Sequence, residues 1–117
     1  MNWDRYIELA REYVRLSNAH ELERIFPMFA EDAVYISKIV GSFEGREAIE
    51  AMMRGFFAKI PDVRWEVAEY ALSGDREVSF DFVRHFSDPE TGGPAQVQGH
   101  EVIVFSEAGL IERIEVG

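Results

Sequence analysis

Apolar side chains recur at steps of three and four through the first thirty residues, and this spacing predicts two amphipathic helices. The first helix is expected over residues 3–17, where charged side chains occupy the remaining positions. A second, shorter helix is expected from Asn18, and Pro27 should kink or shorten it because proline lacks a backbone N–H. The apolar stripes of these helices contain Tyr6, Ile7, Ala10, Tyr13, Val14, Leu22, Ile25, Phe26 and Phe29.

A short strand and a third helix are predicted next. Residues 33–36 form a β-rich run, and Gly41 and Gly45 mark the loop after it. The third helix is expected from about residue 46 to residue 58, and Pro61-Asp62 stops it. Its wide apolar face carries Ile49, Met52, Met53, Phe56, Phe57 and Ile60.

The second half of the chain alternates between apolar and polar positions, which is typical of half-buried strands. Helices followed by antiparallel strands predict an α+β domain. We expect one curved, mixed or mainly antiparallel sheet, with the three helices packed on its concave face. The strands are predicted at residues 63–72, 78–86, 96–105 and 110–116, with turns at 73–76 and 106–109 and a loop at 87–94.

Size and charge narrow the classes of function. A chain of 117 residues is expected to form a single domain, residues 1–117. Twelve basic and 22 acidic residues give a net charge of −10, which disfavours nucleic acid and anionic membranes as partners. The absence of cysteine excludes disulfides and thiolate chemistry. Without a long apolar run or a signal-like N-terminus, we expect a cytoplasmic protein.

Glu101 interrupts an apolar strand face. On the strand at residues 96–105 it shares its side with Val97, Gly99, Ile103 and Phe105, which should face the helices. A carboxyl on such a face must find a partner, reach solvent through a cleft or stay protonated. Either Glu101 lies in a pocket, or it lies near the sheet edge and pairs with a basic helix residue.

Other candidate residues share inward-facing positions. The hydroxyl of Tyr13 needs a partner if buried, and that partner is either a core backbone carbonyl or a ligand. Trp65, Phe80 and Phe82 suit a cavity wall as well as a filled core. Arg84 lies at the same alternate positions of the strand as Phe80 and Phe82, and so on the same face of the sheet. It either approaches the pocket, to pair with Glu101 or a ligand carboxylate, or lies at the sheet edge.

Histidines and valines mark the opposite sheet face. His85 and His100 are expected to point outward with Val83, Val102 and Val104, a combination that favours a subunit interface. His20 is expected to be exposed between two helices. The three histidines show no metal-ligand spacing, and the glycines form no nucleotide-binding motif, so no metal or cofactor is expected.

Three segments resemble one superfamily. The run Phe43-x-Gly45-Arg46-Glu47-x-Ile49 opens a helix, Tyr13-Val14-Arg15-Leu16 precedes the second helix, and Glu101 begins Glu-Val-Ile-Val-Phe before the turn at Gly109. Together they resemble the nuclear transport factor 2-like superfamily, which includes ketosteroid isomerases and SnoaL-like polyketide cyclases. The resemblance implies a cone-shaped sheet (a cystatin-like α+β roll), a hydrophobic cavity, and a homodimer through the outer sheet face.

The resemblance to the isomerases also suggests roles for individual residues. In that group a tyrosine and an acid donate hydrogen bonds to a developing enolate oxygen, and the matching residues here are Tyr13 and Glu101. The group's general base, an aspartate, is matched by Ser37, a poor proton acceptor. Lys38 follows, and it could serve as a base only if burial lowered its pKa; a solvated lysine is the more frequent situation.

Two main functions therefore remain open. One is a cofactor-free enzyme of the isomerase, cyclase or dehydratase-like lyase type, which transfers a proton on a small hydrophobic cyclic carbonyl compound. The other is a non-catalytic ligand-binding or dimerisation module. For the enzyme, Tyr13 and Glu101 are the candidate catalytic pair. The predicted substrate-binding residues are Ser37, Trp65, Phe80, Phe82 and Arg84. A transport adaptor like the superfamily's namesake has no sequence feature in its favour.

Overall fold

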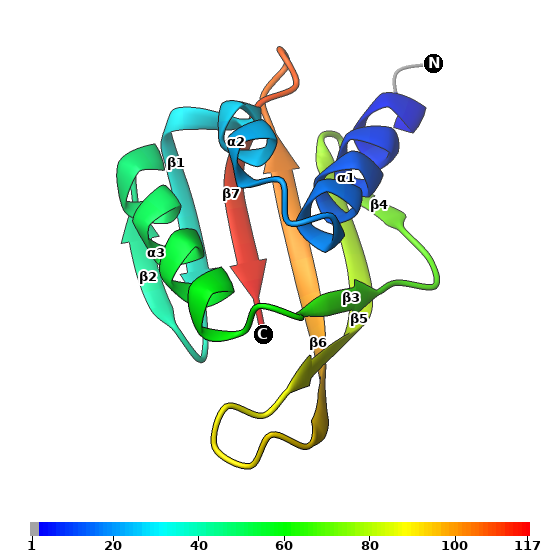
Figure 1. The fold of residues 1–117 in the computed structure, drawn as a ribbon. Helices are drawn as coiled ribbons and strands as arrows, with labels where there is room; N and C mark the ends of the chain where they lie inside the picture. Colours follow the sequence, from blue (N-terminus) through cyan, green and yellow to red (C-terminus); the bar gives the residue numbers. More distant parts are fainter. Residues whose placement is uncertain (1–2) are drawn as a thin grey trace.

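The computed structural model describes residues 3–117 and places the helices on one side of a curved sheet (Figure 1). The N-terminal helix α1 (Trp3–Asn18) is followed by a single turn, α2 (Leu22–Ile25), and a 3-10 turn, η1 (Phe26–Met28). The third helix, α3 (Arg46–Lys59), lies over the opposite part of the sheet from α1.

The sheet found in the described residues is mixed. Strand β1 pairs with β7 in parallel, and the other pairings are antiparallel. The strands run in the order β2-β1-β7-β6-β5-β3, with β4 pairing β5. Their bounds are β1 Phe29–Ser37, β2 Gly41–Glu44, β3 Arg64–Glu66, β4 Ala71–Gly74, β5 Glu77–Ser87, β6 Pro94–Phe105 and β7 Ile111–Val116. This confirms the α+β architecture, with a curved mixed sheet and three helices on its concave face.

The predicted second helix was too long. Phe26 and Phe29 were expected on one helical stripe, but α2 ends at Ile25 and β1 begins at Phe29. Pro27 explains the change, because it cannot donate a backbone hydrogen bond and instead occupies the start of the 3-10 turn.

Two strand predictions also needed correction. The loop expected between Gly41 and Gly45 contains β2, which forms a hairpin with β1; both glycines have the positive φ angles (110° and 90°) that end such a strand. The strand expected at residues 63–72 is divided into β3 and β4. Tyr70 lies in the break between them, and its ring packs on Phe80 with centroids 4.9 Å apart.

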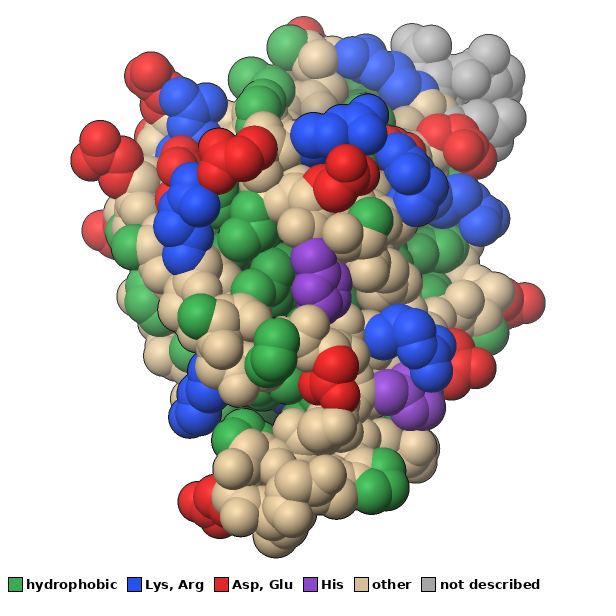
Figure 2. All heavy atoms as spheres, in the orientation of Figure 1, with side chains coloured by type: hydrophobic (Ala, Val, Ile, Leu, Met, Phe, Trp, Pro, Cys, Tyr) green, Lys and Arg blue, Asp and Glu red, His purple; other side chains and the backbone are tan. Residues whose placement is uncertain are grey.

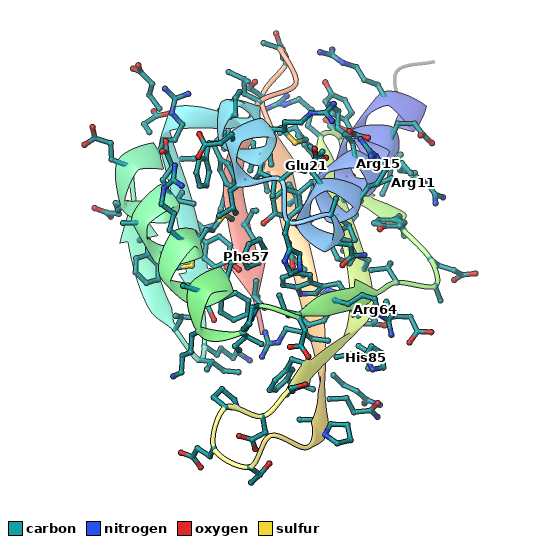
Figure 3. The ribbon with its side chains drawn as sticks, viewed as in Figure 1. Arg11, Arg15, Glu21, Phe57, Arg64 and His85 are labelled. Atoms are coloured by element: carbon teal, nitrogen blue, oxygen red, sulfur yellow. The ribbon has the colours of Figure 1, made fainter. Side chains whose placement is uncertain are left out.

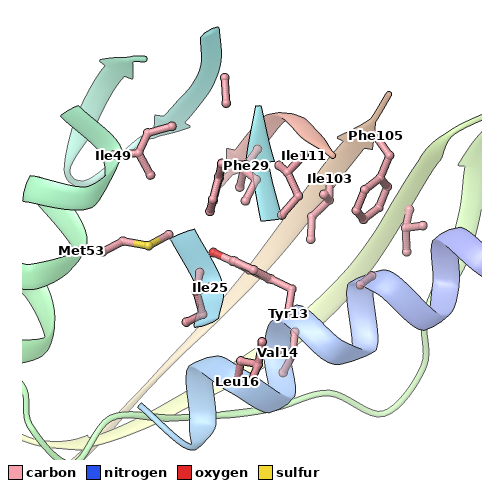
Figure 4. Close-up of a cluster of buried hydrophobic side chains, with 14 of the residues drawn as sticks. Tyr13, Val14, Leu16, Ile25, Phe29, Ile49, Met53, Ile103, Phe105 and Ile111 are labelled. Atoms are coloured by element: carbon pink, nitrogen blue, oxygen red, sulfur yellow. The ribbon is translucent and has the colours of Figure 1, made fainter. Parts of the chain in front are cut away.

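The core lies between the helices and the sheet (Figure 4). Phe29, Ile103, Phe105 and Ile111 are fully buried there, and Ile25 of α2 closes the cluster. The charged surface is mixed: basic and acidic side chains alternate over the helix-bearing face (Figure 2). This core fixes α1 against the central strands of the sheet.

Gly99 allows a close approach between β6 and β5. It is opposite Phe82 in the strand register, and the Phe82 ring lies directly across it. A Cβ atom at Gly99 would lie 2.9 Å from two ring carbons of Phe82 and still closer to the ring tip. Phe82 is buried, so this contact would force its ring or the paired strands to shift.

We predict that Gly99→Ala destabilises the protein by about 1–3 kcal/mol, the usual cost of forcing extra atoms into a packed site. The free energy of unfolding in urea measures this. Gly55→Ala is the matched control, because Gly55 lies in α3 with open space around its Cβ position. That change should stabilise the protein by about 0.5–1 kcal/mol. Equal effects of the two substitutions would contradict the proposed contact.

Candidate active site

A cavity of about 630 Å³ opens between α1, α3 and the concave face of the sheet. Its wall is mostly apolar and aromatic, and its polar side chains come from different elements. All seven candidate residues from the sequence line it, together with α3 side chains that could have filled the space. Those lining residues include Tyr13, Ser37, Trp65, Phe80, Phe82, Arg84, Glu101, Met52, Met53, Phe56 and Phe57.

Glu101 lies in the middle of the sheet and not at its edge. Strand β6 is flanked by β5 and β7, and Glu101 is opposite Phe80 on one side and Val116 on the other. The residue is only 5% exposed, and its Oε2 atom has no hydrogen-bond partner among residues 3–117. Burial raises the pKa of Glu101 from its ordinary value of 4.5 to about 8, and the charge of Arg84 only partly opposes this. The carboxyl group is therefore mostly protonated at neutral pH.

Tyr13 brings a second hydrogen-bonding group into the same cavity. Its ring packs edge-on against Phe29 at 6.0 Å and projects from α1 toward Met53 of α3 (Figure 4). Its backbone carbonyl accepts a hydrogen bond from Ser17 Oγ at 2.8 Å, whereas its hydroxyl has no hydrogen bond within the described part of the chain. Burial, and then the charge of Glu101, raise the pKa of Tyr13 well above its ordinary value, so the hydroxyl stays a donor.

Tyr35 is a third hydroxyl on the cavity wall, and the sequence interpretation missed it. It lies on β1 two residues before Ser37, and so on the same face of the strand. Burial and the charge of Glu101 raise its pKa. Its position two residues before the candidate Ser37, and so on the same strand face, could have identified it from the sequence.

Ser37 and Lys38 do not supply a base in this structure. The Ser37 Oγ atom accepts hydrogen bonds from the backbone N–H groups of Ile39 and Val40, both at 3.2 Å. The hydroxyl therefore stabilises the turn between β1 and β2. Lys38 is exposed at the rim of the cavity, which agrees with the solvated alternative.

Arg84 reaches the cavity, and so does not lie at the sheet edge. The guanidinium carbon is 5.5 Å from the ring centroid of Phe56 and 5.7 Å from that of Phe86. Its Nε atom is buried and has no hydrogen-bond partner among the described residues. Burial lowers the pKa of Arg84, against the opposing effects of Tyr35 and Glu101.

Aromatic side chains from α3 and β3 form one wall of the cavity. Trp65 packs on Phe56 and Phe57 with ring centroids 6.1 Å and 5.8 Å apart. Asn18 holds the backbone of Trp65 through two hydrogen bonds, of 2.7 Å and 2.9 Å. His20, which was expected to be exposed, is half-buried: its ring stacks on Phe57 and bonds the Val63 carbonyl at 2.8 Å. Figure 3 shows Phe57 extending from α3 over the sheet.

The remaining histidines belong to the outer sheet face, as expected. His85 bonds Glu66 at 2.9 Å and His100 bonds Asp81 at 2.8 Å. Both His85 and Arg64 lie on the side of β3 and β5 away from Phe57 (Figure 3). Within residues 3–117, no group of three or more His, Asp or Glu side chains is arranged to hold a metal ion. No helix in this range is long and apolar enough to cross a membrane.

The cavity combines an apolar wall with one acidic side chain. Glu101 is the only carboxyl side chain on the cavity wall in the described structure, and Tyr13 and Tyr35 are hydroxyl donors near it. A carboxyl with a pKa of about 8 changes its protonation state at a pH where proteins work.

We predict that Glu101 makes the protein less stable as the pH rises. Its folded pKa of about 8 lies above its ordinary value, so its contribution is intact below pH 4.5 and is lost as the pH rises toward 8. Denaturation of the wild type and Glu101→Gln across this range tests this. As the pH rises, the free energy of unfolding of the wild type should fall relative to that of Glu101→Gln by up to about 1.4 kcal/mol per pH unit. A difference independent of pH would contradict the buried, protonated carboxyl.

No curated protein matches this chain in sequence. Among solved structures, the epoxide hydrolase/cyclase-like enzyme SalBIII, of pyran ring formation in the polyether salinomycin, is similar with a TM-score of 0.86 at 20% identity, covering 99% of this chain and 92% of that one.

Two further solved structures share the fold. A hypothetical protein with a ketosteroid isomerase-like fold from Catenulispora acidiphila has a TM-score of 0.83 at 16% identity, covering 94% of this chain and 84% of that one. A protein from Mycobacterium tuberculosis, solved in complex with estradiol-17β-hemisuccinate, has a TM-score of 0.81 at 23% identity, covering 94% and 90%. The family model described as the SnoaL-like domain matches residues 10–114. This chain therefore belongs to the SnoaL-like domain family of the nuclear transport factor 2-like superfamily.

Proposed function

We propose that this protein binds a small hydrophobic cyclic carbonyl compound in the cavity and transfers a proton on it without a cofactor, as an isomerase- or cyclase-type enzyme. The observation that carries the proposal is the Glu101 carboxyl, which is buried on the cavity wall with one oxygen lacking a partner among residues 3–117. A buried polar atom without a partner is costly unless a ligand satisfies it. The fold-related M. tuberculosis protein was solved with a steroid derivative, which is in keeping with this class of ligand.

Glu101 is assigned the role of proton carrier, because Ser37 is engaged in a turn and Lys38 is exposed. In its ionised form Glu101 removes the proton from the carbon beside the carbonyl. The electron pair of that C–H bond forms the C=C bond of an enolate, and the negative charge moves to the oxygen. Tyr13 donates a hydrogen bond to this oxygen. When Glu101 returns the proton to another carbon of the enolate system, the carbonyl is restored and the product is an isomer.

We predict that the protein catalyses hydrogen–deuterium exchange beside the carbonyl of cyclic ketones. Tetralone and larger ring ketones in heavy water, followed by proton NMR, provide the assay. Glu101→Gln should lower the rate by about 10²–10⁴-fold, as expected for loss of a general base. Tyr13→Phe should lower it by about 10²–10³-fold through loss of one oxygen donor. The wild-type rate should rise with pH through about 8, as Glu101 ionises.

Tyr6→Phe is the matched control for Tyr13→Phe. Tyr6 lies on the same helix and is buried, but its ring packs on Phe105 in the core outside the cavity. Its substitution should leave the exchange rate unchanged. Exchange at the wild-type rate by Glu101→Gln would exclude Glu101 as the proton carrier.

The second candidate function is ligand binding without turnover. It is favoured by Ser37, whose hydroxyl already accepts two backbone hydrogen bonds at the position where the isomerases carry their base. In the same NMR samples, binding of a ring ketone without any exchange would support this alternative.

We further propose that a second copy of the chain covers the outer sheet face. Val83 lies there between the His85–Glu66 and His100–Asp81 pairs, and Val102 and Val104 lie on the other side of the His100–Asp81 pair. All three valines are partly buried. Such a face suits an isologous interface, in which the same patch occurs on both subunits.

We predict that Val102→Lys shifts the protein from dimer to monomer, because each copy would bury a charge at the interface. Sedimentation velocity measures the change. Glu47→Lys introduces the same side chain at an exposed position of α3, on the helix side of the sheet; it is the control and should leave the dimer intact. A wild-type protein that sediments as a monomer at high concentration would contradict the interface.

A further inference from the structure

The charged side chains on the cavity wall are mainly basic. Arg84, Lys38 and Lys59 line the cavity, and Glu101 is the only acidic side chain that does so in the described structure. Glu101 is mostly uncharged at neutral pH because burial raises its pKa to about 8. The chain as a whole carries a net charge of −10. The cavity is therefore a locally positive region in an acidic protein, which favours an anionic ligand there.

Arg84 is the most deeply placed of these cations. Its guanidinium is half-buried between the rings of Phe56 and Phe86, which fix its orientation. In the part of the chain that the structure describes, Arg84 forms no salt bridge and its buried Nε atom lacks an acceptor. Surface arginines such as Arg15 and Arg54 pair with glutamates instead. Arg84 thus retains donors for a group that enters from outside the chain.

The strand register sets the distance between Arg84 and Glu101. Glu101 is opposite Phe80 on β5, and Arg84 lies four residues further along that strand. At about 3.4 Å per residue, the two positions are about 14 Å apart along the sheet. Both side chains point into the cavity, so a polycyclic molecule could contact one group at each end.

We propose that Arg84 binds a carboxylate on the ligand, so that the ligand is a polycyclic acid with a carbonyl or phenolic oxygen at one end and a carboxylate at the other. The inference rests on the proposed function, because it assumes that the same cavity holds the rings. A carboxylate fits the donors of a single guanidinium, which bind both of its oxygens side by side. A simple stacking role for Arg84 would give no preference for an acid over its neutral ester, and the experiment separates the two roles.

Isothermal titration at neutral pH with a matched pair of probes tests this. The probes are the hydroxynaphthoic acid whose hydroxyl and carboxyl groups lie at opposite ends of the ring system, and its methyl ester. Hydroxyaryl acids from a single ring to a steroid-sized skeleton, each with its ester, extend the series. The wild type should bind the best acid at least about tenfold more tightly than its ester, since hydrogen bonds to charged groups are stronger than neutral ones.

Variants then assign this preference to one residue. Arg84→Met should reduce the preference to about twofold or less while the ester's affinity stays within about threefold, and Arg84→Lys should keep part of the preference. Arg64→Met is the matched control, because it removes the same charge from the adjacent strand β3 but from outside the cavity wall. It should leave the wild-type preference unchanged. Thermal unfolding checks that each variant is folded.

The possible failures are distinct. Equal affinity of the wild type for acid and ester would overturn the role of Arg84 while leaving the proposed function intact, and this comparison needs no variant. A preference that survives in folded Arg84→Met would overturn it as well. If no acid or ester of the series binds, both the inference and the proposed binding function fail.

Discussion

The burial of one carboxyl group in the middle of the sheet is the constraint on which the site depends. Glu101 has no access to solvent at a sheet edge, because β5 and β7 flank its strand, and its side chain faces the helices. Desolvation therefore favours its neutral form. A neutral acid with a free oxygen atom is stable there only if the cavity offers it water or a ligand. The buried carboxyl therefore depends on the cavity beside it.

The surrounding residues keep this space open at some cost in packing. Phe56, Phe57 and Trp65 pack against one another along the wall, and Asn18 holds the Trp65 backbone, so these large rings do not fill the centre. Gly99 allows the Phe82 ring to lie flat on β6. A solid apolar core would be more stable, because removing unsatisfied polar atoms and filling voids both stabilise proteins. The retained space and unpaired atoms are consistent with selection for binding.

Much of this arrangement could be predicted from the sequence because it depends on short periodicities. The alternation along residues 96–105 assigned Glu101 to the inner face, and the helical spacing placed Tyr13 on the buried side of α1. Features that depend on tertiary contacts could not be found in this way. In the break between β3 and β4, Tyr70 packs on Phe80, a contact that the alternating pattern does not indicate. The half-burial of His20 depends on Phe57, which lies far along the chain.

The identity of residue 37 limits the chemistry available to such a cavity. Where a site has both an acid and a separate base, one group removes a proton while another stabilises the oxygen. Here Ser37 is held in a turn, so in the proposed mechanism a single carboxyl accepts the proton and gives it back. The proton then leaves and returns on the same face of the ligand, at carbon atoms within reach of one side chain. This geometry favours a proton shift between neighbouring positions of a conjugated ring over reactions that need an acid and a base on opposite faces.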